Sequence, residues 1–172
     1  MKTKLFITVA GVVFAACAST GATPVSGTIE VTGLDYSYSG IPDVAASGAE
    51  LTFTNASDAE FHEMVVMKVA DLETRTIEEL LELPESESES LVEFQGVLFA
   101  MPGEAGSSPE GGSSITVTEP GRYGVFCFIP QGADPAVVAE SMQAGGEGPP
   151  DLGDGTPHAL LGMVAEFQVE EA

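Results

Sequence analysis

Four side chains of the 172-residue sequence could bind a soft metal ion together: His62, Cys127, His158 and Met163. The chain has two histidines and two cysteines, and the other cysteine, Cys17, lies close to the start. A lone cysteine in a domain can be a buried apolar residue, an unpaired thiol, a nucleophile or a metal ligand. A thiolate and two imidazoles in one plane, with a weak thioether on the axis, accommodate both Cu(I) and Cu(II). These residue types therefore favour a copper site, in which the metal would hold Cys127 as a thiolate.

Each of the four residues also has a plainer interpretation when it is taken alone. His62 could be a hydrogen-bonded strand histidine, His158 a loop residue and Met163 a core residue. Cys127 beside a histidine could be a nucleophile, but its apolar neighbours would raise the pKa of the thiol. A multicopper enzyme would need further histidines, which the sequence lacks. We therefore predict that the protein is not an enzyme.

Short segments with β-type alternation occur on both sides of these residues and must position them. They predict an all-β, Greek-key, antiparallel β-sandwich. The segment that contains Cys127 is apolar on both faces, which predicts a central strand. The expected strands cover residues 28–32, 36–38, 50–54, 61–69, 115–118, 121–130 and 164–169.

Two inserted loop and helix segments interrupt this pattern, at about 71–113 and 131–156. In the first, Thr76 and Glu79 form a capping-box pattern, which predicts a short helix that ends at Pro84. The acidic, low-complexity residues that follow, Glu85 to Ser90, predict a mobile loop. In the second insertion, a helix is expected to begin at Asp134-Pro135.

The start of the chain has the pattern of an export signal. Residues 1–16 combine a basic start with an apolar run that is too short to span a bilayer, so they are expected to be a signal peptide. Ala15-Ala16-Cys17 is similar to a bacterial lipobox, although cleavage at an A-x-A site is an alternative. We expect residues 17–27 to be a lipid-anchored tether, residues 28–172 to be the domain, and the protein to lie in the periplasm or at the cell surface.

The charge of the chain restricts its partners. After Cys17 there are 27 acidic residues and three basic ones, Lys68, Arg75 and Arg122, a net charge of −24. Nucleic-acid binding is excluded because phosphate contacts need cations, and direct binding to an anionic membrane is not expected. The acidic surface suits salty surroundings. Alternatively, it could steer a basic partner protein toward this chain, which we expect to be a monomer.

Three motifs resemble those of plastocyanin/azurin-like blue copper proteins, the cupredoxins. Gly121 to Cys127 (GRYGVFC) is similar to the Gly-x-Tyr-x-x-aromatic-Cys strand, Pro157-His158 through Gly162-Met163 to the ligand loop, and Asn55 through His62 to the first ligand site. The resemblance implies the ligands His62, Cys127 and His158, with Met163 on the axis. Two features depart from the family pattern: thirty residues separate Cys127 from His158, and Glu63 follows the first histidine.

The resemblance implies a copper protein of the cell envelope that carries one electron at a time. Its partner would be a redox protein, a cytochrome or a membrane oxidoreductase, and Ala159 to Leu161 would give an apolar docking patch. An alternative is copper handling as a chaperone, scavenger or sensor that binds Cu(I), for which the His62-Glu63-Met64 pattern is suited. A further alternative is a metal-free cupredoxin fold used as a binding module.

Overall fold

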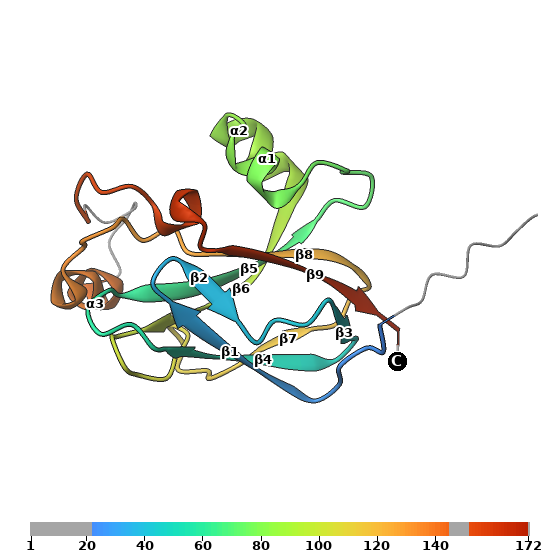
Figure 1. The fold of residues 1–172 in the computed structure, drawn as a ribbon, viewed down its shortest axis with the longest axis horizontal. Helices are drawn as coiled ribbons and strands as arrows, with labels where there is room; N and C mark the ends of the chain where they lie inside the picture. Colours follow the sequence, from blue (N-terminus) through green and yellow to red (C-terminus); the bar gives the residue numbers. More distant parts are fainter. Residues whose placement is uncertain (1–21, 145–151, 172) are drawn as a thin grey trace, which may run out of the picture.

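In the part of the chain that the structure describes, nine β-strands form two sheets that pack face to face (Figure 1). The computed structural model describes residues 22–144 and 152–171. The strands are β1 Thr28–Leu34, β2 Ser37–Ser39, β3 Val44–Ala46, β4 Ala49–Asn55, β5 His62–Val69, β6 Val92–Ala100, β7 Ile115–Val117, β8 Gly121–Phe126 and β9 Val164–Glu170. Their order is β2-β1-β4-β7 in one sheet and β3-β9-β8-β5-β6 in the other. The predicted all-β sandwich is confirmed.

The strand that leads to Cys127 is central, as predicted. β8 lies in the middle of the five-stranded sheet, between β9 and β5, and Cys127 follows its last residue. The prediction of a purely antiparallel sandwich is wrong, because β1 pairs with β4 and β3 pairs with β9 in parallel. These pairs join strands that are not consecutive in the chain, so local alternation carries no information on their direction.

The core between the sheets follows from strand alternation. In β1 and β4 every second side chain is buried, including Ile29, Val31, Leu51 and Phe53. These residues form one apolar cluster with side chains from β5 to β9. Burial of this apolar surface is the main force that holds the two sheets together.

Strand β6 corrects the sequence interpretation, which placed it inside the 71–113 insertion. β6 pairs with β5 along its whole length. Phe94 is exposed, and the pairing register shifts at Val66/Met67 opposite this part of β6. Such a bulge and an exposed aromatic residue weaken the period-two pattern by which a strand is recognised. The segment that leaves the sheet therefore runs only from Ala70 to Leu91.

That segment carries α1 (Ile77–Leu81), α2 (Glu85–Ser88) and η1 (Glu89–Leu91), and they stand over the outer face of the five-stranded sheet (Figure 1). The capping box is confirmed: the Glu79 N–H donates to Thr76 Oγ1, and the Thr76 N–H donates to the Glu79 carboxylate. The prediction of a mobile loop at 85–90 is wrong, because these residues are helical. Carboxylates in a first turn stabilise a helix N-terminus.

Two further helices lie at one end of the sandwich, opposite the end of β9 (Figure 1). They are α3 (Pro135–Ala144) and the 3-10 helix η2 (His158–Leu161). The helix expected to begin at Asp134-Pro135 is thus present. Within the described parts of the chain, no helix is long and apolar enough to cross a membrane.

Candidate metal centre

The side chains of His62, Cys127 and His158 converge at this end of the sandwich. The Nδ1 atoms of the two histidines are 3.2 Å apart, and Cys127 Sγ is 3.4 Å from His158 Nδ1. The possible ligand atoms of all three residues lie within 4.8 Å of one another, and all three side chains are fully buried. The structure therefore brings together three residues that are 96 and 31 positions apart in the chain.

The first histidine is held by a buried amide at the end of β4. Asn55 Nδ2 donates to the carbonyl oxygens of Glu60 and Ala100, at 2.8 and 3.1 Å, and its Oδ1 accepts from the Ser57 N–H. These bonds shape the turn that enters β5, of which His62 is the first residue. The Asn55 motif identified in the sequence thus positions His62.

Backbone hydrogen bonds hold the segments of Cys127 and His158 against each other. The Ala159 N–H donates to the Cys127 carbonyl at 2.7 Å, and the His158 N–H donates to the Ile129 carbonyl at 3.0 Å. The Cys127 N–H in turn donates to the carbonyl of Met163 at 3.3 Å. The relative positions of thiol and imidazole are therefore set by a short backbone ladder.

The thirty-residue separation between Cys127 and His158 is closed at its base. The Gln131 N–H donates to the Thr156 carbonyl at 2.9 Å, and Pro130 and Pro157 lie opposite each other as an antiparallel bridge. A side chain at Gly155 would overlap the Gln131 backbone, which explains a glycine there. The long insertion thus leaves and rejoins the ligand segments at one point.

Met163 lies beside this cluster and is fully buried. It belongs to the same apolar cluster as Cys127 and Phe61, separate from the main core. Its methyl group packs close to Gly33, where a side chain would also collide with Phe53. Axial ligation by Met163 stays a prediction.

Burial sets the protonation of the three converging groups. It raises the pKa of the Cys127 thiol to about 12, with the Glu63 carboxyl group adding to the rise. Burial, together with the neighbouring His158, lowers the pKa of His62 to about 4, and burial also lowers the pKa of His158. The free site is therefore neutral near pH 7, and such a thiol is a poor nucleophile without a metal.

The donors fit a copper ion in type and in spacing. Atoms bonded to one metal ion at about 2.0 to 2.3 Å lie roughly 3 to 4 Å apart. The distances from His158 Nδ1 to His62 Nδ1 and to Cys127 Sγ, 3.2 and 3.4 Å, fall in this range. An imidazole that binds a metal through Nδ1 keeps its proton on Nε2. Here Nε2 of His62 faces Asp35 Oδ1 at 3.8 Å, and Nε2 of His158 faces Glu60 Oε2 at 3.6 Å. Among the described residues, neither Nε2 atom has a hydrogen-bond partner.

The sequence did not reveal the polar groups that surround the ligands. The Glu63 N–H points at Cys127 Sγ, 3.5 Å away, and Glu63 Oε1 accepts from the Phe128 N–H at 2.8 Å. The Glu63 backbone carbonyl accepts from the Tyr38 hydroxyl at 2.5 Å. The only sequence signal was the position of Glu63 directly after the first histidine. This residue links the His62 strand to the Cys127 segment.

The fold is a two-sheet β-sandwich, and its buried site brings together two imidazoles and a thiol, with a buried methionine beside them. No family model matches the sequence, and no curated protein matches it. Among solved structures, the chain is similar to reduced auracyanin from the photosynthetic bacterium Roseiflexus castenholzii, with 17% identity and a TM-score of 0.48, covering 85% of this chain and 98% of that one. Auracyanin A, a "blue" copper protein from Chloroflexus aurantiacus, has 17% identity and a TM-score of 0.45, covering 86% and 100%. A multi-copper oxidase from Pediococcus acidilactici has 12% identity and a TM-score of 0.38, covering 93% of this chain and 29% of that one.

Proposed function

We propose that the protein binds one copper ion through His62, Cys127 and His158, with Met163 on the axis, and acts as a one-electron carrier. The observation that carries this proposal is the convergence of two imidazole Nδ1 atoms and a thiol sulfur in a fully buried cluster. Copper bound there would supply a one-electron couple between its cuprous and cupric states. Sulfur suits the cuprous ion and imidazole is acceptable to both.

The protein contributes a rigid and dry set of donors. The Asn55 bonds and the ladder between the Cys127 and His158 segments hold the donor atoms in place. The Glu63 N–H, directed at Cys127 Sγ, stabilises negative charge on this sulfur. Because the donors are fixed and buried, little rearrangement is required when the charge of the site changes.

Copper handling is the weaker candidate. Met64, which follows His62 by two residues, is fully buried in the main core and does not belong to the cluster around Cys127. The three donors are themselves fully buried. A closed site of this kind favours retention of an ion over its delivery.

The cellular setting is part of the proposal. Residues 1–21, which contain the expected signal peptide and Cys17, lie outside the described residues. Their sequence supports export to the periplasm or cell surface, with a lipid on Cys17. The acidic surface supports a basic redox partner, a cytochrome or a membrane oxidoreductase, that meets a monomeric carrier in brief encounters.

Visible and electron-paramagnetic-resonance spectra after addition of Cu(II) test the copper site. We expect an intense blue band in the wild type that ascorbate bleaches and ferricyanide restores. Cys127→Ser should abolish the band because the sulfur provides the charge-transfer bond. Met163→Leu should keep the band and raise the reduction potential, because a weak axial ligand tunes the site. A colourless protein that holds only Cu(I) would favour copper handling, and an intense band in Cys127→Ser would refute the assignment.

A further inference from the structure

The histidine rings themselves offer no surface to a partner. His158 is fully buried. The Tyr36 ring lies 5.0 Å from its ring, between centroids, and the Glu60 carboxylate lies 3.6 Å from its Nε2. Gln131 donates to the Tyr36 hydroxyl at 2.8 Å, and the Gly132 N–H donates to Glu60 at 3.1 Å. The second insertion and the β1–β2 turn thus cover the ring edge that faces away from Cys127.

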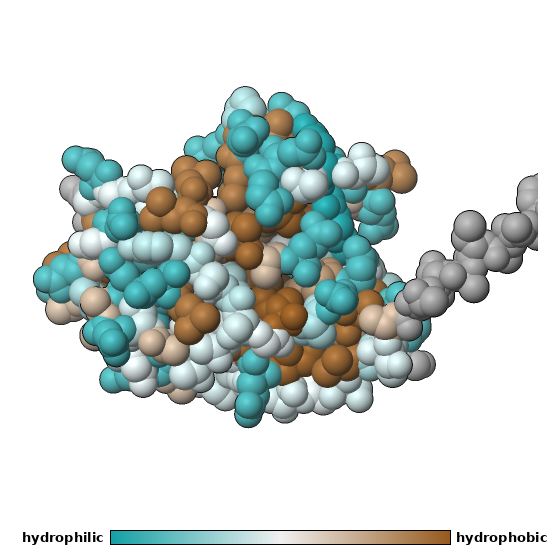
Figure 2. Space-filling view, in the orientation of Figure 1, coloured by the Kyte–Doolittle hydropathy of each residue, from teal (hydrophilic) through white to brown (hydrophobic). Residues whose placement is uncertain are grey.

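An apolar groove of about 420 Å³ opens instead beside the residues that flank the ligands. Phe126 and Phe128, the neighbours of Cys127 in the chain, line it together with Ala159 and Leu160, which follow His158. The rings of Phe126 and Phe128 stack with centroids 5.5 Å apart. Phe128 is 40% exposed and Leu160 is 57% exposed. Figure 2 shows hydrophobic side chains gathered over η2 and at the foot of the α1–α2 segment.

The opposite wall of the groove is the α1–α2–η1 segment, and it is firmly attached. Leu80 lines the groove and is buried in one cluster with Phe126 on the outer face of the sheet. Arg122, on β8, donates to the backbone carbonyls of Glu73 and Arg75, at 3.1 and 2.8 Å. The groove is therefore present without a partner, as binding sites for apolar groups usually are.

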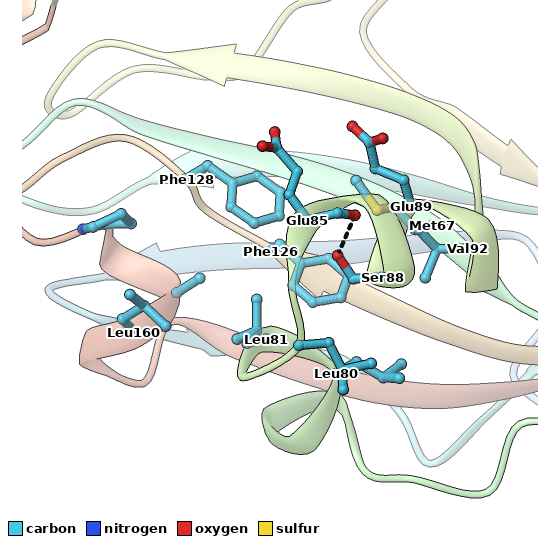
Figure 3. A pocket seen from close by; sticks show the side chains of 13 residues that line it. Met67, Leu80, Leu81, Glu85, Ser88, Glu89, Val92, Phe126, Phe128 and Leu160 are labelled. Atoms are coloured by element: carbon cyan, nitrogen blue, oxygen red, sulfur yellow. Dashed lines mark hydrogen bonds between the residues drawn. The ribbon is translucent and has the colours of Figure 1, made fainter.

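Two carboxylates stand at the rim of this apolar surface. Glu85 and Glu89 line the groove, and in Figure 3 their carboxylates point away from Leu80 and Leu81. Neither has an ion-pair partner among the described residues, whereas Glu87 between them pairs with Arg75. Among the residues that the structure describes, no basic one lines the groove. Its chemistry matches an apolar side chain flanked by lysine or arginine.

We propose that this groove is the docking site of the redox partner, and that a basic protein inserts an apolar side chain between Phe128, Leu160 and Leu81. This inference rests on the proposed function as an electron carrier. It extends the apolar patch expected at Ala159 to Leu161 to Phe126 and Phe128, which flank Cys127. The charge of −24 would steer the partner, and the two rim carboxylates would fix its orientation.

The first test uses a basic c-type cytochrome as the probe and measures its bimolecular rate with the copper-loaded protein by stopped flow. Glu85→Lys/Glu89→Lys should lower the rate at least tenfold at low ionic strength, and the loss should shrink in high salt. The control Glu30→Lys/Glu50→Lys makes the same charge change on exposed residues of β1 and β4. It should lower the rate less than threefold. Equal losses in the two pairs would overturn the docking site.

A second pair of variants separates apolar contact from charge. Leu160→Ser should lower the cytochrome rate severalfold at every salt concentration, because it removes exposed apolar surface and no charge. Leu72→Ser is the matched control, since Leu72 is 96% exposed and does not line the groove. It should leave the rate unchanged. A rate unaffected by Leu160→Ser would count against the proposal.

Amide chemical shifts give a direct readout that does not depend on electron transfer. Addition of the cytochrome to the metal-free protein should shift the amides of Leu81, Phe128 and Leu160. Shifts confined to Tyr36 and Gln131 would overturn the proposal. The proposal would also be overturned if these amides shifted only with a short-chain quinol, because the groove would then bind a small molecule. It would be overturned too if they shifted when the protein concentration alone was raised, because the groove would then bind a second copy of the chain. Failure of ascorbate and ferricyanide to cycle the blue band would instead refute the proposed function.

Discussion

Replacement of Glu63 by glutamine should change how stability depends on pH. The Glu63 carboxyl group is buried beside Cys127 and accepts a hydrogen bond from the Phe128 N–H. Burial raises its pKa from 4.5 to about 7, although the Phe128 bond opposes the rise. The unfolded chain therefore releases this proton at a lower pH than the folded protein does. The stability contributed by the group is complete below pH 4.5 and is lost as the pH rises through about 7.

The size of the effect follows from the shift of the pKa. One pKa unit corresponds to about 1.4 kcal/mol, so the free energy of unfolding should fall by roughly 2 kcal/mol between pH 5 and pH 7 through Glu63 alone. His62 and His158 act in the opposite direction. Burial lowers their pKa values, to about 4 for His62, so their contribution is present above pH 6.5 and is lost in acid. The difference between wild type and Glu63→Gln isolates the carboxyl group.

Urea denaturation of the metal-free proteins, with a chelator present, measures this difference at several pH values. Glutamine keeps an oxygen that can accept from the Phe128 N–H and cannot ionise. We expect the free energy of unfolding of the variant, relative to that of the wild type, to rise by roughly 2 kcal/mol from pH 5 to pH 7. Glu50→Gln, on the exposed side of β4, controls for the loss of one carboxylate. Parallel curves for wild type and Glu63→Gln would refute the reasoning, since they would mean that Glu63 ionises without cost.

Two further substitutions test the frame around the ligands. Asn55→Ala should lower the free energy of unfolding by roughly 3 kcal/mol, because it leaves buried backbone groups unsatisfied. Urea denaturation checks this value, and the expected loss for Ser57→Ala, which removes a hydroxyl acceptor from the same turn, is smaller, about 1 kcal/mol. Gly155→Ala should cost about 1 to 3 kcal/mol by pushing against the Gln131 backbone and should weaken copper binding. Unchanged copper affinity in that variant, measured by competition with a chelator of known affinity, would show that the base of the insertion does not position His158.

Much of the sandwich could be predicted because its strands alternate. β1, β4 and β9 bury every second side chain over most of their length, and a period of two is visible in the sequence. β3 has only three residues and pairs in parallel with a strand at the other end of the chain. Its existence depends on tertiary contacts, so no local pattern could have revealed it.

The ligand types were predictable for a different reason, which is their rarity. Two histidines and one cysteine in the domain leave few combinations to consider. The carboxylates that face these histidines were not predictable, because Asp35 and Glu60 are two of 27 acidic residues. Only the fold brings them within 4 Å of the imidazole Nε2 atoms. The polar surroundings of a site therefore need the structure even where its ligands do not.

The two insertions affect access to the site more than its donor geometry. The second insertion begins and ends at the Gln131–Thr156 pair. Its length therefore adds to the conformational entropy that is lost when the loop is ordered, and it leaves the hydrogen bonds between the Cys127 and His158 segments intact. Its first residues cover His158 through Tyr36 and Glu60. The first insertion adds a wall over Phe126 and creates the groove. Under the proposed function, a partner would thus reach the donors from the side of the groove, which the first insertion forms, while backbone bonds keep the ligands fixed.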